Sequence, residues 1–175
     1  WDGDSSNILP TVPGFTTGIT SESSGTFADF ENRGDGVRDN TFTATKWYNN
    51  NRLDQYDYAI DGAAAEIIAA VASVESNLPE GNDNVYDFVR GVFDYIRDKI
   101  SYDNDAPAPS RSGPTCLADK TGDCDEQTNA FLSMLRVRGV PGWYVFGILS
   151  SQSFTQWEAH AWGSVSYTHL RAHET

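Results

Sequence analysis

The sequence is poor in several chemically informative residue types. Among its 175 residues are two cysteines, three histidines, and twelve lysines and arginines against 25 acidic side chains. Two cysteines cannot build a disulfide scaffold, although the sequence allows a single disulfide bond. The net charge of −13 repels nucleic acid and anionic membrane surfaces, so neither is expected as a partner. Such an excess of acid also suits salty or extracellular surroundings.

Long hydrophobic runs are absent as well. A membrane-spanning helix needs about 20 apolar residues. The alanine-rich stretch over residues 63–74 is shorter and contains Glu66, so no membrane-spanning segment is expected. Hydrophobic residues still make up 39% of the chain and aromatic residues 13%, which is enough for one domain with a core. The oligomeric state stays open.

The spacing of apolar residues predicts two helices in the middle of the chain. Apolar side chains recur at helical spacing over residues 58–77 and again over residues 84–99. Residues 1–56 are rich in Gly, Ser, Thr, Asn and Asp, which predicts loops and a few strands. Proline and glycine punctuate residues 103–114, which predicts a surface loop.

A third helix is predicted to begin at Asp123 or Cys124. Asp123 suits the N-cap, and Glu126 three residues later completes the pattern of a capping box. Gly139 suits the position after the helix, where a left-handed backbone is common. Cys124 would then open the helix, with Asp125 turned to solvent.

Two strands should follow this helix. Residues 143–149 form an unbroken run of aromatic, aliphatic and β-branched residues, which is typical of a strand buried on both faces. Residues 158–162 alternate in character and predict a second strand, which carries His160.

The final residues carry no function in our interpretation. Residues 164–175 can be encoded by nucleotides that resemble a common sequencing-library adapter read in frame, so native sequence is expected to end near Gly163. His169 and His173 would then be accidental, which leaves His160 as the only native histidine. The start at Trp1 is likewise interpreted as an internal position of a longer protein.

Cys124 stands where a thiol can act as a nucleophile. Only the thiolate attacks, and the unpaired amides and partial positive charge of a helix start stabilise an anion. The same amides can donate hydrogen bonds to the oxyanion of a tetrahedral intermediate. Asp123 and Asp125 oppose this effect, because nearby carboxylates raise the pKa of a thiol. A histidine partner is therefore needed, and His160 is the candidate.

Other roles for these residues stay open. Cys124 could be a buried structural residue, or a disulfide partner of Cys116 if the turn between them brings their Cα atoms within about 7 Å. A zinc site is disfavoured because there is no C-x-x-C pair and one native histidine leaves a tetrahedral set incomplete. Acidic clusters such as Asp83 and Asp87 match no calcium-loop spacing. No metal and no cofactor is therefore expected.

The motif order in this region resembles that of the transglutaminase-like superfamily. That family's signature is G-x-C at a helix start, then L-x-R-x-x-G-[IV]-P ahead of a strand, then H-A-W on a following strand. The resemblance covers about residues 85–163. The chain follows this order with Gly122 and Cys124, then with Leu135, Arg136, Gly139, Val140 and Pro141, and then with His160, Ala161 and Trp162, although Leu135 stands directly next to Arg136.

The resemblance implies an α+β fold with a papain-like transglutaminase core. In that core the nucleophilic cysteine opens a helix that packs on an antiparallel sheet. Residues 57–163 would form the core, incomplete at its C-terminal end. Residues 1–56 would be an irregular, β-leaning N-terminal segment, and residues 164–175 the non-native tail.

The resemblance also implies a Cys-His-Asp triad and acyl transfer on the amides of a protein or peptide. Cys124 would form a thioester and His160 would carry the proton, in hydrolysis by a cysteine protease or in transglutamination. The family's aspartate lies on the strand after the histidine, and no aspartate follows His160 here. The second hypothesis is a non-catalytic binding module with the same fold, against which the intact Cys-His pair argues.

Overall fold

The computed structural model describes residues 25–28, 44–46, 58–150 and 155–165. In chain order its elements are β1 (Ala44–Lys46), β2 (Tyr58–Asp61), α3 (Ala65–Glu75), α4 (Val85–Lys99), β3 (Ser101–Tyr102), α5 (Gly113–Asp119), β4 (Thr121–Gly122), α6 (Cys124–Val137), β5 (Gly142–Ser150) and β6 (Trp157–Val165). None of the helices in these ranges has the length and apolar character that crossing a membrane requires.

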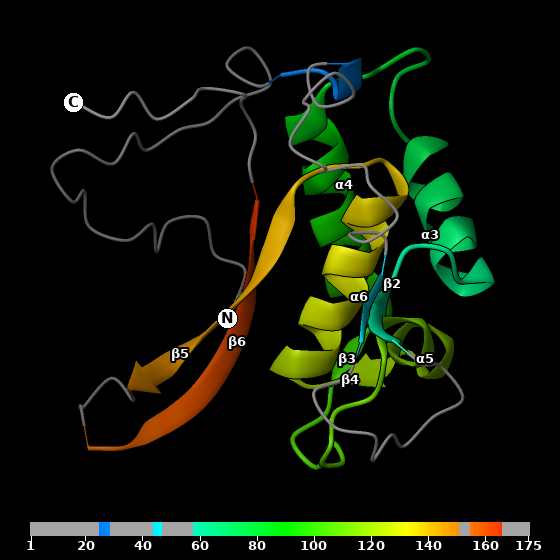
Figure 1. Cartoon of the computed structure of the whole chain (residues 1–175). Helices are drawn as coiled ribbons and strands as arrows, with labels where there is room; N and C mark the ends of the chain where they lie inside the picture. The colour runs from blue at the N-terminus through cyan, green and yellow to red at the C-terminus, as the bar shows by residue number, and fades with distance from the viewer. Residues whose placement is uncertain (1–24, 29–43, 47–57, 151–154, 166–175) are drawn as a thin grey trace, which may run out of the picture.

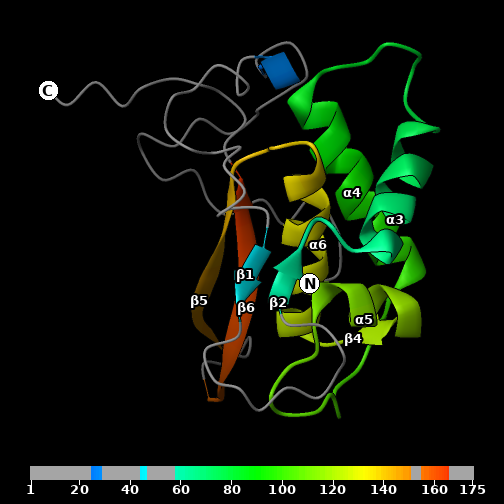
Figure 2. The same cartoon turned by 45° about the vertical axis from the view of Figure 1, so that its right-hand side comes forward.

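Helix α6 lies at the centre of the fold. Figures 1 and 2 show α3, α4 and α5 gathered on one side of it and the β5–β6 hairpin on the other. Burying one large apolar side chain stabilises the fold by about 1.5–3 kcal/mol. This core therefore fixes the orientation of α6, whose first residue is Cys124. Among its fully buried side chains are Ile67, Val71, Val85, Phe88, Val92, Leu132, Met134 and Leu135.

The helices in the middle of the chain form where apolar spacing predicts them, with different ends. Helix α4 begins after Asn84, whose side-chain oxygen accepts a hydrogen bond from the amide of Asp87 at 3.2 Å. Helix α3 is shorter than predicted, because residues 58–61 form β2 and pair antiparallel with β1. Helix α5 was not predicted. Its seven residues are too few for a periodic signal, and Ser112 caps it by accepting from the amide of Thr115.

The described strands form three pairs. Strands β3 and β4 are parallel and set Tyr102 opposite Gly122, two residues before Cys124. Strands β5 and β6 form an antiparallel hairpin of nine residues each, from Gly142 opposite Val165 to Ser150 opposite Trp157. These two pairs bring Tyr102 and the hairpin to the first turn of α6.

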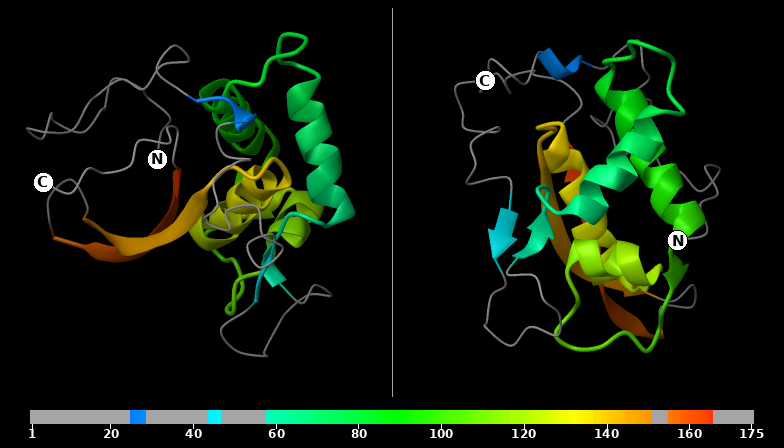
Figure 3. Two further views of the ribbon diagram at one scale, coloured as in Figure 1. Left: turned by 45° about the horizontal axis from the view of Figure 1, so that its top comes forward. Right: turned by 90° about the vertical axis from the view of Figure 1, so that its right-hand side faces the viewer.

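The β5–β6 hairpin is not buried on both faces, which corrects the prediction for residues 143–149. Trp143 is 54% exposed, and Phe146 and Ile148 are each 66% exposed. Figure 3 shows the hairpin along one side of α6, with its far end reaching past the helices. An apolar run shows that a strand can be buried, but burial depends on neighbouring elements that the run itself does not encode.

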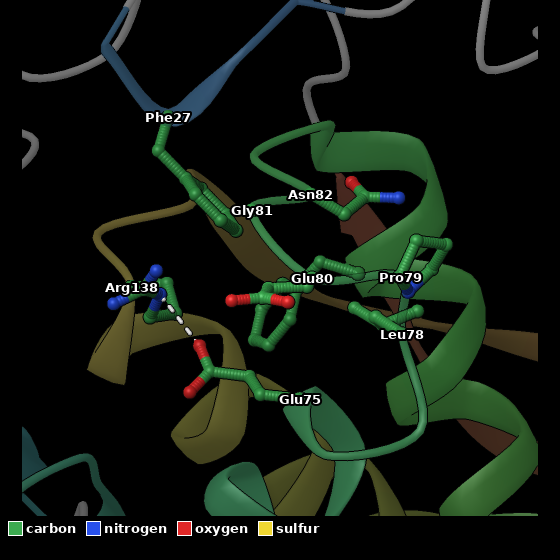
Figure 4. Close-up of a pocket in the computed structure, with 9 residues that line it drawn as sticks. Phe27, Glu75, Leu78, Pro79, Glu80, Gly81, Asn82 and Arg138 are labelled. Carbon is green, nitrogen blue, oxygen red and sulfur yellow. Dashed lines mark ion pairs between the residues drawn. The ribbon is translucent and has the colours of Figure 1, made fainter.

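Two described parts of residues 1–56 contact the rest of the fold. Phe27 is buried and packs edge-on against Phe88, with ring centroids 5.4 Å apart, while β1 pairs with β2. A cavity of about 220 Å³ lies beside these two rings, with the Glu75–Arg138 ion pair at its edge (Figure 4). Arg138 caps the C-terminal end of α6, so this cavity is remote from Cys124. The domain boundaries at residues 56 and 163 stay predictions.

Candidate active site

The first turn of α6 presents Cys124. Its N-cap is Asp123, as predicted, and the Asp123 Oδ1 atom accepts hydrogen bonds from the amides of Asp125 at 2.9 Å and Glu126 at 3.2 Å. The reciprocal half of the predicted capping box is not formed, because the Glu126 carboxylate pairs with Arg111 instead. At the other end of the helix, Gly139 has the predicted left-handed backbone, with φ of 67°.

Glu126 and Arg111 form a buried ion pair beneath the cysteine. The fully buried Glu126 carboxylate accepts from Arg111 Nε and Nη2, each at 2.8 Å, and from the Arg111 amide at 2.9 Å. Arg111 Nη1 also donates to Asp119 at 2.8 Å. The hydrogen bonds that Arg111 donates to Glu126 raise the pKa of Arg111 further above its already high value. The pair fastens residues 103–112 to the first turn of α6.

Gly122 makes room for this pair. A Cβ atom at Gly122 would lie 2.8 Å from Cys116 Sγ and 2.9 Å from both Cβ and Oε2 of Glu126. Only a residue without a side chain fits there. This contact gives a physical reason for a glycine two residues before Cys124.

The variant Gly122→Ala is expected to destabilise the fold by about 3 kcal/mol, because its methyl group would push against the buried ion pair. Urea denaturation of the full chain measures this. The matched control is Gly81→Ala. It has no neighbour within 4 Å at the added Cβ and carries only the strain of a φ of 74°, so it should lose about 1 kcal/mol. Equal losses in the two variants would show that the close packing at Gly122 is unimportant.

The Cys124 thiol is partly buried against residues from several elements. Burial raises its pKa, and the charges of Asp125 and Asp123 raise it further. The backbone of Ala161 and the hydroxyl of Tyr102 act in the opposite direction, since each donates a hydrogen bond to the sulfur, but the net shift is upward. The neutral thiol is therefore the resting form. The helix start does not by itself produce a thiolate.

Asp125 does not face open solvent, which corrects the prediction. Its Oδ1 atom accepts a hydrogen bond from the Tyr144 hydroxyl at 2.6 Å, and its Oδ2 atom accepts from Ser110 Oγ at 3.0 Å. The Cys124 sulfur lies 3.8 Å from the same Oδ1 atom. Sequence reasoning missed Tyr144 and Tyr102, because only the strand pairings bring these tyrosines to the helix start.

His160 lies on the strand that passes the thiol. The next residue, Ala161, contacts the sulfur through its backbone amide. Within the described residues, no hydrogen bond or ion pair joins the His160 ring to Cys124, and that ring stacks on Trp162 with centroids 6.1 Å apart. Burial lowers the pKa of His160, so its imidazole is neutral at pH 7.

Strand alternation explains the direction of the His160 ring. Ala161 is buried, and a Cβ atom at Gly163 would lie 2.8 Å from a ring carbon of Phe131 on α6, so Ala161 and Gly163 face that helix. Neighbouring residues of a strand point to opposite faces. His160 and Trp162 therefore lie on the face away from α6. The structure brings the backbone of β6, rather than the imidazole, against the thiol.

Cys116 does not pair with Cys124. Both cysteines are free thiols. Cys116 is fully buried, and burial raises its pKa to about 12, so it is chemically inert in the folded protein. No group of three or more His, Cys, Asp and Glu side chains in the described part of the chain has the arrangement to hold a metal ion.

The fold and the site define a class of protein: an α+β core in which a cysteine opens a central helix that packs on an antiparallel hairpin. The profile of the transglutaminase-like superfamily matches residues 72–170, more than half of the chain. The chain belongs to this superfamily. Both the predicted resemblance and the predicted α+β fold class are thereby confirmed, and at the coarse level the protein is cysteine-enzyme-like.

Solved structures similar to part of the chain include the following one. It is described as a "putative cysteine protease" from Cytophaga hutchinsonii, with 16% sequence identity and a TM-score of 0.46. The similarity covers 57% of this chain and 33% of that protein, so this chain spans about a third of its length. No curated protein matches the sequence.

Proposed function

We propose that the chain carries out thiol-dependent acyl transfer on amides of a protein or peptide, through a thioester on Cys124. One observation carries this proposal. In a chain of the transglutaminase-like superfamily, the partly exposed thiol opens the central helix and touches the strand that bears His160. The other cysteine is fully buried and out of reach of a substrate.

The protonation states of the two residues suit a concerted mechanism. The raised pKa of Cys124 leaves it a thiol at rest, and the lowered pKa of His160 leaves it a neutral base. As the sulfur attacks the carbonyl carbon, His160 takes the thiol proton and then gives it to the leaving amine. The amide C–N bond breaks and a thioester forms. Water or a second amine then attacks the thioester carbonyl and displaces the sulfur.

This mechanism requires the His160 ring to come within hydrogen-bond reach of Cys124. Catalytic hydrogen bonds are often absent or long before substrate binds and tighten in the complex. The contact of the Ala161 amide with the sulfur supports the proposal, because it brings the strand that bears His160 against the thiol. The ring itself has to turn from the face of β6 that points away from α6. The amide of Cys124 donates to the Tyr102 hydroxyl at the helix start, and it can donate to the oxyanion once a substrate displaces that hydroxyl.

His160→Ala is expected to lower the rate of acyl transfer by about 10²- to 10⁴-fold, because a positioned general base contributes that much. The full chain is assayed with a glutamine-containing peptide, by following both peptide cleavage and the attachment of a fluorescent primary amine. Cleavage alone indicates hydrolysis, and attachment of the amine indicates transglutamination. Glu158→Ala, an exposed change on the same strand, is the control. An unchanged rate in folded His160→Ala would contradict the role of His160.

A non-catalytic module is the second candidate. It is favoured by one observation, that the imidazole ring and the thiol are not hydrogen-bonded in this structure. The test uses the folded, unmodified chain, in which Cys116 stays buried. If this chain transfers no acyl group from peptides or from activated esters, the non-catalytic module is the better account.

A further inference from the structure

Asp125 is held beside the candidate nucleophile from two sides. Tyr144 reaches it from β5 and Ser110 reaches it from the segment before α5, with hydrogen bonds of 2.6 Å and 3.0 Å. We propose that Asp125 is a positioning residue of the site: these two hydroxyls compete with the thiol for its carboxylate and so set how readily Cys124 ionises. As far as it concerns catalysis, this inference rests on the proposed function.

The geometry divides the carboxylate between its partners. The Oδ1 atom that accepts from Tyr144 at 2.6 Å also accepts a long hydrogen bond from the Cys124 thiol at 3.8 Å. An ionised carboxylate only accepts hydrogen bonds, so the tyrosine must be the donor, and hydrogen bonds to charged acceptors are the strong ones. The short bond to Tyr144 therefore competes with the thiol for the same oxygen. Without the bond from Tyr144, Oδ1 would accept more strongly from the S–H group, and the thiol would keep its proton more firmly.

The other charged and titratable groups around the thiol are less adjustable. Asp123 on α6 is directed at two backbone amides, and Glu126 is paired with Arg111. Tyr102 on β3 donates to the sulfur, and His160 on β6 is turned toward Trp162. Asp125 is the charge whose effect on the sulfur depends on hydroxyls from other elements.

The two hydroxyls come from different segments of the fold. Tyr144 belongs to the hairpin, and Ser110 immediately precedes Arg111, which is fixed to the first turn of α6 by its ion pair with Glu126. A displacement of either segment would change the partners of Asp125. The reactivity of the thiol therefore depends on where the hairpin lies relative to the helix start.

The test is the rate at which iodoacetamide alkylates Cys124 in the full chain at pH 7, located by mass spectrometry. Asp125→Asn removes a negative charge beside the sulfur and should speed alkylation by about three- to tenfold. Tyr144→Phe removes the hydroxyl but keeps the ring, and it should slow alkylation by about two- to fivefold. With both changes together, Tyr144→Phe should have no further effect, because the charge on which it acts is gone.

A merely structural role would not produce opposite effects in the two single variants together with the loss of the Tyr144→Phe effect in the double variant. Tyr95→Phe on α4 is the matched control and should leave the rate unchanged. If Tyr144→Phe leaves the rate unchanged or raises it, or if its effect persists alongside Asp125→Asn, the proposal is wrong. Cys116 is alkylated only when the chain unfolds. Should the Tyr144 variant unfold, Ser110→Ala decides the matter: slower labelling supports the proposal and an unchanged rate overturns it.

Alkylation needs no turnover, so the two proposals fail separately. If the labelling rates shift as expected but the chain has no acyl-transfer activity, the proposed function is wrong and this inference holds. If activity depends on Cys124 but the labelling rate does not change in the Asp125 and Tyr144 variants, this inference is wrong and the proposed function holds.

Discussion

Replacing Cys124 by alanine is expected to abolish acyl transfer, with a loss of at least about 10⁴-fold, since loss of the nucleophile removes the covalent path altogether. The effect should be on turnover and not on stability, because the thiol is only partly buried and fills no part of the main core. Cleavage of the peptide and attachment of the amine should fall together, because both reactions pass through the same thioester.

The matched control is Cys116→Ala. That thiol is fully buried, so a substrate cannot reach it, and its pKa is raised to about 12, so it stays protonated at neutral pH. Its replacement should lower stability by about 1 kcal/mol through the small cavity it leaves and should keep activity in the folded protein. Activity that survives in Cys124→Ala, or is lost only in Cys116→Ala, would assign the chemistry to another group.

The variant Glu126→Leu is expected to destabilise the fold by about 3 kcal/mol, because it leaves the Arg111 guanidinium largely buried without its main partner. Urea denaturation of the full chain gives the change in free energy of unfolding. The double variant Arg111→Met with Glu126→Leu removes both charges and should recover much of the loss.

An exposed ion pair provides the control for this experiment. Asp94 pairs with Arg90 and Arg97 on the outer face of α4, where all three side chains are well exposed to solvent. Asp94→Ala should therefore change the denaturation midpoint little. If Glu126→Leu is as mild as Asp94→Ala, the buried pair is not what fastens residues 103–112 to α6.

Features set by local sequence were predicted from the sequence. The cap at Asp123, the start of α6 and the left-handed Gly139 each depend on a few neighbouring residues, and all three are present. The same holds for α4, whose apolar stripe needs no knowledge of its partners. Motif order then added the family, because the spacing between the G-x-C and H-A-W motifs reflects a fold that composition alone does not specify.

Features set by distant contacts were not predicted. Asp125 was expected in solvent because its partners, Ser110 and Tyr144, come from other elements. The run over residues 143–149 indicates a strand but not how many neighbours it has. The H-A-W motif predicts the strand of His160 but not the face of its ring, since a shift of one residue in register exchanges the two faces.

The pKa of the Cys124 thiol also depends on distant contacts. The sequence predicts Cys124 at a helix start, where the backbone amides lower the pKa of the thiol and the carboxylates of Asp123 and Asp125 raise it. The structure adds burial, which raises the pKa of the thiol, and the Tyr102 hydroxyl and Ala161 amide, which oppose that rise. These contributions to the pKa depend on which elements cover the helix start. The sequence alone does not place β3 and β6 there, so it does not predict them.

The central claim is a thioester on Cys124, and locating the acyl group tests it most directly. The full chain is mixed with an activated ester such as a p-nitrophenyl ester, quenched in acid within its first turnover, digested and mapped by mass spectrometry. We expect one acyl group, on the peptide that contains Cys124. Hydroxylamine should remove this group, and the variant Cys124→Ala should lack it. An acyl group on another residue, or none while the ester is turned over, would contradict this claim.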